Sequence, residues 1–204
     1  MAKKKNPAQH GRLRWFEPQE LDASQRALYE RIVGRPRLQG ASAPSLTDDA
    51  GRLHGPLNAM LLNPAVGGAQ LELGTRVRFD TRFTARAREI AILELSAQRR
   101  CGFEWCAHEP TGRKAGLTDA ELAAIRTGEP APTFDAEEAL VRELVGTLVR
   151  ERDLDDATFA RATATLGEGK LMDLVAIVNY YDSVALSLAV WRPPYPPGAK
   201  SPFG

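Results

Sequence analysis

Apolar residues recur at spacings of three and four along most of the chain, which is the spacing of one face of an α-helix. The clearest stretch follows Thr84, a residue type that suits the N-cap of a helix. Its apolar side chains are Ile90, Ile92, Leu93, Leu95 and Ala97. Glu89 lies inside this stretch, and a carboxylate on a largely buried helix needs a partner there.

The same spacing predicts eight further helices. Capping boxes open two of them, at Thr118–Glu121 and Asp135–Glu138, and Gly167 and Gly169 separate the last two. Alternating β-branched runs, the signature of strands, are absent from the sequence. We therefore expect an all-α bundle of about seven to nine helices. The eight lie at about 22–33, 57–62, 64–79, 101–115, 118–128, 135–151, 156–166 and 170–191.

Three segments follow from this pattern. Residues 1–14 contain Lys3, Lys4 and Lys5 with no apolar run after them, and we expect a disordered basic N-terminus that is not a secretory signal. Residues 15–192 should form one helical domain, with a loop at 37–51 that is rich in Gly, Ser and Pro. Residues 193–204 contain five prolines and predict a Pro-rich, extended C-terminal tail.

Composition and charge exclude several classes. A formal net charge of +1 gives no global electrostatic case for nucleic acid. Two cysteines form no disulfide framework and suit the reducing cytoplasm. The last helix nearly reaches membrane-span length, but Asp173, Asn179 and Asp182 interrupt it, so we expect no membrane span. Its apolar surface instead predicts a homo-oligomer, as a dimer, trimer or hexamer. No metal or cofactor motif is present.

Candidate chemistry is concentrated after the central helix. Cys101, Glu104 and His108 stand at i, i+3 and i+7, which places them on one face of a helix. A glutamate four residues before a histidine can orient its ring, and a cysteine at a helix N-terminus is expected to favour the thiolate. The plainer alternative is that the glutamate and the histidine form a solvated surface pair.

These residues resemble the carboxymuconolactone decarboxylase-like family, which includes the alkylhydroperoxidase (AhpD-type) proteins. The matching motifs are R-E-I-A-I-L, then C-x-x-E-W-x-x-x-H, then K-A-G-L-T-D-A-E-L. The resemblance covers about 50–190 and implies an AhpD-like bundle with Cys101, His108 and Glu89 at the motif positions. Glu104 occupies the position of the second cysteine of the peroxidase branch. The C-x-x-C redox pair of that branch is therefore missing.

Two chemistries compete. Acid–base chemistry on a small carboxylated or lactone substrate, as in a decarboxylase, would use His108 as acid or base, Glu104 to orient it and Glu89 as its buried partner. Peroxide reduction would use Cys101 as nucleophile. Cys106 cannot easily resolve it, because residues five apart on a helix lie beyond disulfide reach. A non-catalytic helical oligomerisation or binding module is the third alternative.

A carboxylated substrate would need a cationic partner. The sequence does not choose among the arginines near the motif, and we take Arg86 and Arg100 as candidates, together with His54 ahead of the short helix at 57–62. The expected partners are a small-molecule substrate and further copies of the chain.

Overall fold

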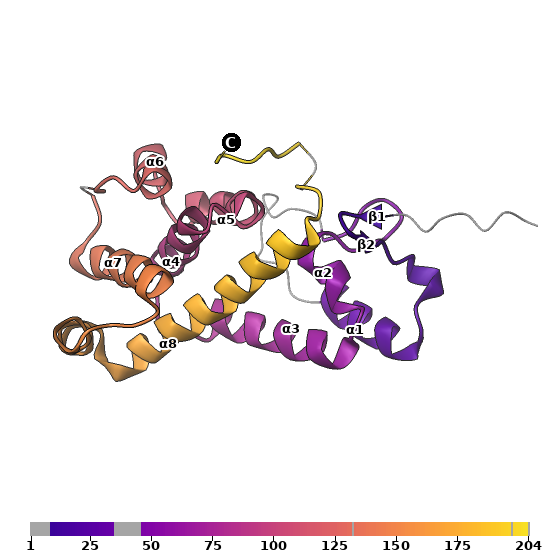
Figure 1. Ribbon diagram of the computed structural model, residues 1–204, viewed down its shortest axis with the longest axis horizontal. Coiled ribbons are helices and arrows are strands. Elements are labelled where there is room, and N and C mark those ends of the chain that lie inside the picture. The colour runs from indigo at the N-terminus through magenta and orange to yellow at the C-terminus, as the bar shows by residue number, and fades with distance from the viewer. Residues whose placement is uncertain (1–8, 35–45, 132, 197, 204) are drawn as a thin grey trace, which may run out of the picture.

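The computed structural model describes residues 9–34, 46–131, 133–196 and 198–203, and its described part is an almost wholly helical bundle (Figure 1). Eight α-helices lie within these residues, a number that agrees with the predicted seven to nine. Their bounds are α1 Ala23–Val33, α2 Gly55–Met60, α3 Pro64–Phe79, α4 Ala85–Gln98, α5 Gly102–Lys114, α6 Asp119–Thr127, α7 Ala136–Glu151 and α8 Asp156–Trp191.

Helix α4 is the centre of the bundle. It packs against α5, α6, α7 and α8, and every residue from Glu89 to Ser96 on it is buried. The largest core cluster joins α4 to α7 and α8 through Ile92, Leu95, Leu144 and Leu174. A helix that is covered on all sides needs apolar residues around its circumference, which explains why its sequence shows a broad stripe.

The predicted helix starts are confirmed at their caps. The side chain of Thr84 accepts a hydrogen bond from the backbone N–H of Ala87 at 3.1 Å. Complete capping boxes open α6 at Thr118 and α7 at Asp135. These bonds satisfy N–H groups that a helix leaves without partners in its first turn.

Helix α8 contains the break that the sequence predicts. Gly167 has φ 75° and ψ 157°, outside the helical region, so the element is two helices joined at a kink. By length and hydropathy alone this element passes as a membrane-spanning candidate, a test that core helices also pass. Met172 and Leu186 on it are 66% and 67% exposed, and the predicted homo-oligomer stays a prediction.

The N-terminal boundary placed at residue 14 is wrong for residues 9–14, while residues 1–8 lie outside the described part. Strands β1 (Gln9–His10) and β2 (Leu13–Arg14) pair antiparallel. Two hydrogen bonds hold the hairpin to the rest of the chain. Arg12 N–H donates to Trp191 O at 2.8 Å, and the buried His10 ring accepts from Gly55 N–H at 2.7 Å. Trp15 stacks on His10, so packing orders a segment too short to show a pattern.

The Pro-rich tail also differs from the prediction of an extended arm. It folds back over α5, where Tyr195 stacks on Phe103 and Phe203 meets Trp105 edge to face. Phe203 is 9% exposed and belongs to a core cluster with Trp105. Two aromatic anchors supply enough apolar burial to hold a segment that has no helical or strand pattern.

Candidate active site

The site is built by α4 and α5, which a tight turn folds against each other. Helix α4 ends at Gln98, and α5 begins at Gly102. Arg100 adopts φ 50° in this turn, and Cys101 N–H donates back to Ser96 O at 2.8 Å. The reversal brings Glu89 of α4 beside His108 of α5, as the sequence predicts from two helices joined by a short turn.

His108 lies between two buried glutamates. Its Nδ1 is 2.8 Å from Glu89 Oε2, a hydrogen bond, and its Nε2 is 3.6 Å from Glu104 Oε2, beyond hydrogen-bond range. All three side chains are at most 7% exposed. The three residues converge as the sequence predicts. The residue expected to orient the ring was Glu104, but the hydrogen bond that orients it comes from Glu89.

The bond to Glu89 assigns the imidazole proton. An ionised carboxylate only accepts hydrogen bonds, so in neutral His108 the proton belongs on Nδ1 and the lone pair on Nε2. Nε2 then faces Glu104, whose pKa is raised because burial disfavours its charge; Glu89 acts in the same direction, while His108 and Arg78 oppose it. Glu104 thus gains a neutral form that can donate a hydrogen bond.

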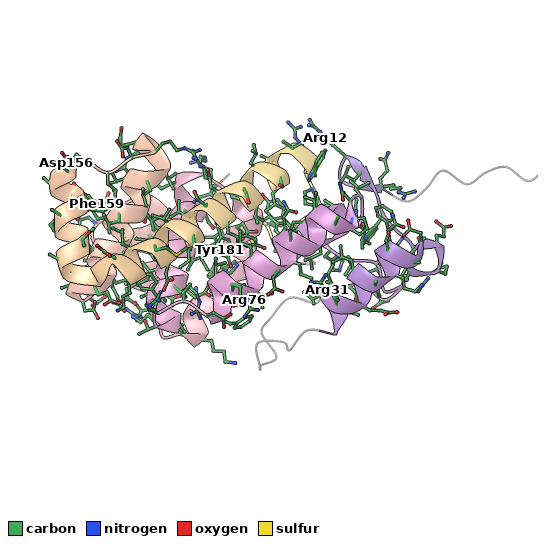
Figure 2. The ribbon with its side chains drawn as sticks, turned by 90° about the horizontal axis from the view of Figure 1, so that it is seen from below. Arg12, Arg31, Arg76, Asp156, Phe159 and Tyr181 are labelled. Atoms are coloured by element: carbon green, nitrogen blue, oxygen red, sulfur yellow. The ribbon has the colours of Figure 1, made fainter. Side chains whose placement is uncertain are left out.

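A cavity of about 190 Å³ opens beside these residues. Glu104 and His108 lie in its wall, together with Arg78 from α3 and Tyr181 from α8. Figure 2 shows Tyr181 in the middle of the molecule, on α8 where this helix packs against α3. The ring of Tyr181 meets His108 edge to face at 5.1 Å between centroids, and its buried hydroxyl has no hydrogen-bond partner among the described residues.

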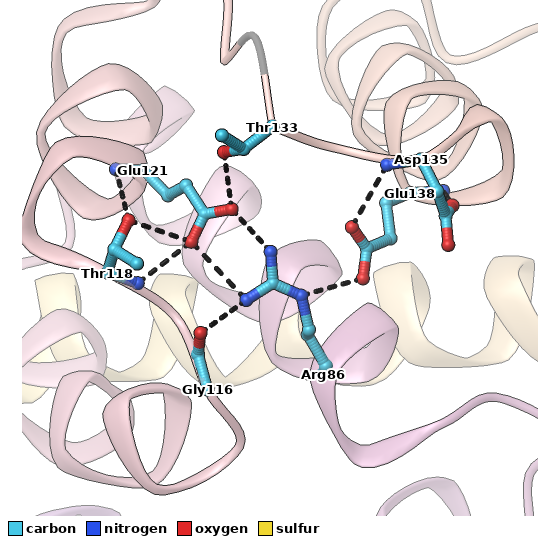
Figure 3. A network of polar contacts seen from close by, with 7 residues as sticks. All are labelled: Arg86, Gly116, Thr118, Glu121, Thr133, Asp135 and Glu138. Carbon is cyan, nitrogen blue, oxygen red and sulfur yellow. Dashed lines mark hydrogen bonds and ion pairs between the residues drawn. The ribbon is translucent and has the colours of Figure 1, made fainter.

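Of the predicted substrate-binding residues, only His54 lines the cavity. Arg100 donates to the backbone oxygen of Phe203 and so holds the tail. Arg86 donates to Glu121, to Glu138 and to Gly116 O, a network between α4, α6 and α7 (Figure 3). Both arginines hold segments of the fold together and lie outside the cavity lining, so the prediction that they bind substrate is wrong for this cavity.

The arginine that does line the cavity is Arg78, which sequence reasoning missed. Leu71, Gly74 and Arg78 are spaced by three and four along α3, and all three belong to the cavity wall. This spacing was a usable signal. The sequence alone does not say which face of α3 lines the cavity. The structure shows that this face does, while Val77 packs into the main core.

Cys101 lies outside the cavity lining and packs against the main core. The expected thiolate is contradicted: burial raises the pKa of the Cys101 thiol to about 11, which outweighs the backbone N–H groups at the start of α5. Burial also raises the pKa of Cys106, whose Sγ lies 3.4 Å from Lys200 O. Both cysteines are free thiols.

Comparison with known proteins agrees with the helical fold. Residues 64–145 match the model of the carboxymuconolactone decarboxylase family. The crystal structure of a protein of unknown function from Agrobacterium tumefaciens, described as an AhpD-type candidate for antioxidant defence, has a TM-score of 0.59 at 16% identity. The match covers 68% of this chain and 96% of that chain. No curated protein matches the chain.

Both comparisons therefore point to the carboxymuconolactone decarboxylase and AhpD-like proteins, the first through the sequence of residues 64–145 and the second through the fold. The resemblance recognised from the sequence is confirmed: residues 64–145 are similar to the carboxymuconolactone decarboxylase family, and the chain has an AhpD-like helical fold. Glu104 stands where the resemblance places the second cysteine of the redox branch.

Proposed function

We propose that the cavity is an active site for acid–base chemistry on a small carboxylated or lactone substrate, most simply a decarboxylation. The observation that carries the proposal is the buried row Glu89–His108–Glu104, in which one carboxylate fixes the imidazole and the other end of the row lies in a cavity wall. Buried, coupled carboxylates around a histidine are a usual arrangement for proton transfer.

The steps follow from the positions of the groups. As the carbon–carboxylate bond breaks and carbon dioxide leaves, its electron pair moves into the neighbouring carbonyl, which becomes an enolate. Neutral Glu104 donates a hydrogen bond to the developing oxyanion. The imidazolium form of His108 then gives its Nε2 proton to the carbon and recovers a proton from water, while Glu89 stabilises the imidazolium through Nδ1.

A direct test is release of carbon dioxide from a panel of small 3-oxo acids and carboxylated lactones. We expect the wild-type chain to turn over at least one member, and His108→Gln to lose that turnover by about 100-fold or more, the usual scale for a general acid–base group. Failure of the wild-type chain to change any member, or full activity in His108→Gln, would contradict the proposal.

Peroxide reduction through Cys101 is disfavoured, because the thiol is largely protonated at neutral pH and lies outside the cavity lining. We expect Cys101→Ser to keep the acid–base activity within about 3-fold and to leave any slow hydroperoxide consumption unchanged. Coupled assays with a thiol reductant and an organic hydroperoxide measure the second quantity. Rapid consumption that disappears in Cys101→Ser would restore the redox alternative.

A further inference from the structure

The guanidinium of Arg78 forms no ion pair within 4.0 Å and no hydrogen bond with a carboxylate in the part of the chain that the structure describes, although its charge acts on Glu104. Two residues earlier on α3, Arg76 pairs with Glu72 and Asp80, each at 2.8 Å. Arg82, Arg86 and Arg142 likewise pair with carboxylates. Arg78 instead lines the cavity, and its ring neighbour is Phe79, at 5.8 Å from the guanidinium carbon to the ring centroid.

Apolar and aromatic side chains make up much of the remaining cavity lining. Phe103 and Tyr180 contribute rings, and Leu57, Met60 and Val184 contribute aliphatic side chains. Such walls suit a flat, unsaturated body, and a guanidinium at the wall suits a carboxylate, which it can bind through two parallel hydrogen bonds. Among the described residues of the lining, Arg78 is the sole arginine or lysine.

The lining also limits how much negative charge the cavity can take. Glu104 is buried there, and Glu89 lies behind His108. A second carboxylate on the ligand would be buried without a second guanidinium to balance it, and an unpaired charge in a partly dry site is costly. One guanidinium in the lining therefore matches a ligand with a single negative charge.

We propose that Arg78 is the substrate-binding residue of this cavity and that the cavity selects small planar monocarboxylates, with the carboxylate on Arg78 and the rest of the molecule directed towards His108. The reaction that follows rests on the proposed function, but the binding preference does not. In this proposal Arg78 binds the substrate carboxylate, a role that the sequence analysis assigns to Arg86 or Arg100.

Benzoate, benzamide and isophthalate are suitable probes, since the first two share a shape and differ in charge, and the third adds a second carboxylate. Dissociation constants are measured at pH 7 by titration with calorimetry or with chemical shifts of the cavity residues. We expect the wild-type chain to bind benzoate at least about 10-fold more tightly than benzamide or isophthalate, from the strength of charge-assisted pairing.

Arg78→Met should abolish the preference for benzoate over benzamide and leave benzamide affinity within about 3-fold. Arg76→Met is the matched control, because it removes an arginine from the exposed side of the same helix, and it should keep the full preference. Arg78→Lys should keep part of it, since lysine carries the charge without the planar fork. Melting temperatures of all three variants show whether each one folds.

Three results would overturn the inference: a benzoate preference that survives in folded Arg78→Met, no preference in the wild-type chain, or no binding of benzoate at millimolar concentration. His108→Gln separates this inference from the proposed reaction, because it should lose turnover and still prefer benzoate. If Arg78→Met loses the preference but the wild-type chain is inactive on every carboxylate, the proposed reaction is contradicted and the binding inference is not.

Discussion

Replacing Glu89 by glutamine is expected to lower kcat by about 10² to 10⁴-fold, the range for general acid–base groups and for a histidine that loses its orienting carboxylate. Glutamine keeps the size of the side chain but can no longer stabilise a positive charge on His108 through Nδ1. It can also turn its amide N–H₂ towards Nδ1 and so reverse the tautomer. Steady-state kinetics on the substrate found for the wild-type chain measures the effect.

Glu94→Gln is the matched control for this prediction. Glu94 lies on the same helix and is 4% exposed, but it accepts from Arg142 at 2.8 Å and lies outside the cavity lining. We expect Glu94→Gln to reduce stability and to keep kcat within about 3-fold. Equal losses of kcat in both variants would mean that Glu89 acts through the fold rather than through His108.

Arg86→Met is expected to lower the free energy of unfolding by about 3 kcal/mol, because it leaves two nearly buried carboxylates without their cation. The side chains of Glu121 and Glu138 are 3% and 10% exposed, and both lose their ion pair (Figure 3). Urea denaturation measures the change. Arg113→Met is the control, since its pairs with Glu109 and Asp119 are exposed and should contribute less than about 1 kcal/mol.

The same network gives this stabilisation a pH dependence. Burial opposes ionisation of Glu121, but hydrogen bonds from Arg86, Thr118 and Thr133 prevail and hold its pKa at about 2. A depressed pKa stabilises the fold above the pKa of an unfolded glutamate, 4.5, and this contribution is lost as the pH falls from there towards 2. Arg86→Met should therefore cost less at pH 3 than at pH 7; an equal cost at both would contradict the assignment.

The sequence predicts the helices well because their signals are local. The caps at Thr84, Thr118 and Asp135 each need only a side chain three residues from an N–H group, and Gly167 breaks α8 through its own dihedral angles. The hairpin at 9–14 and the folded-back tail carry no such signal. They are held by contacts across the chain, such as Phe203 with Trp105.

The candidate site divides in the same way. Glu89, Glu104 and His108 could be placed together from helix spacing and one tight turn. The choice of arginine could not, because Arg78, Arg86 and Arg100 differ in what α6, α7 and the tail place beside them rather than in local sequence. The prediction of a thiolate at Cys101 is wrong for a related reason. The sequence shows that Cys101 lies at the start of a helix, but it does not show that the thiol is buried.

Glu89 is expected to hold the imidazole of His108 with its Nε2 lone pair towards Glu104 and the cavity. Nitrogen-15 spectra of the His108 ring test it without any substrate, because the two ring nitrogens have different shifts when protonated and when free. We expect neutral His108 to carry its proton on Nδ1 in the wild-type chain and to lose this preference in Glu89→Gln. A proton on Nε2 in the wild-type chain, or an Nδ1 proton that is unchanged in Glu89→Gln, would contradict it.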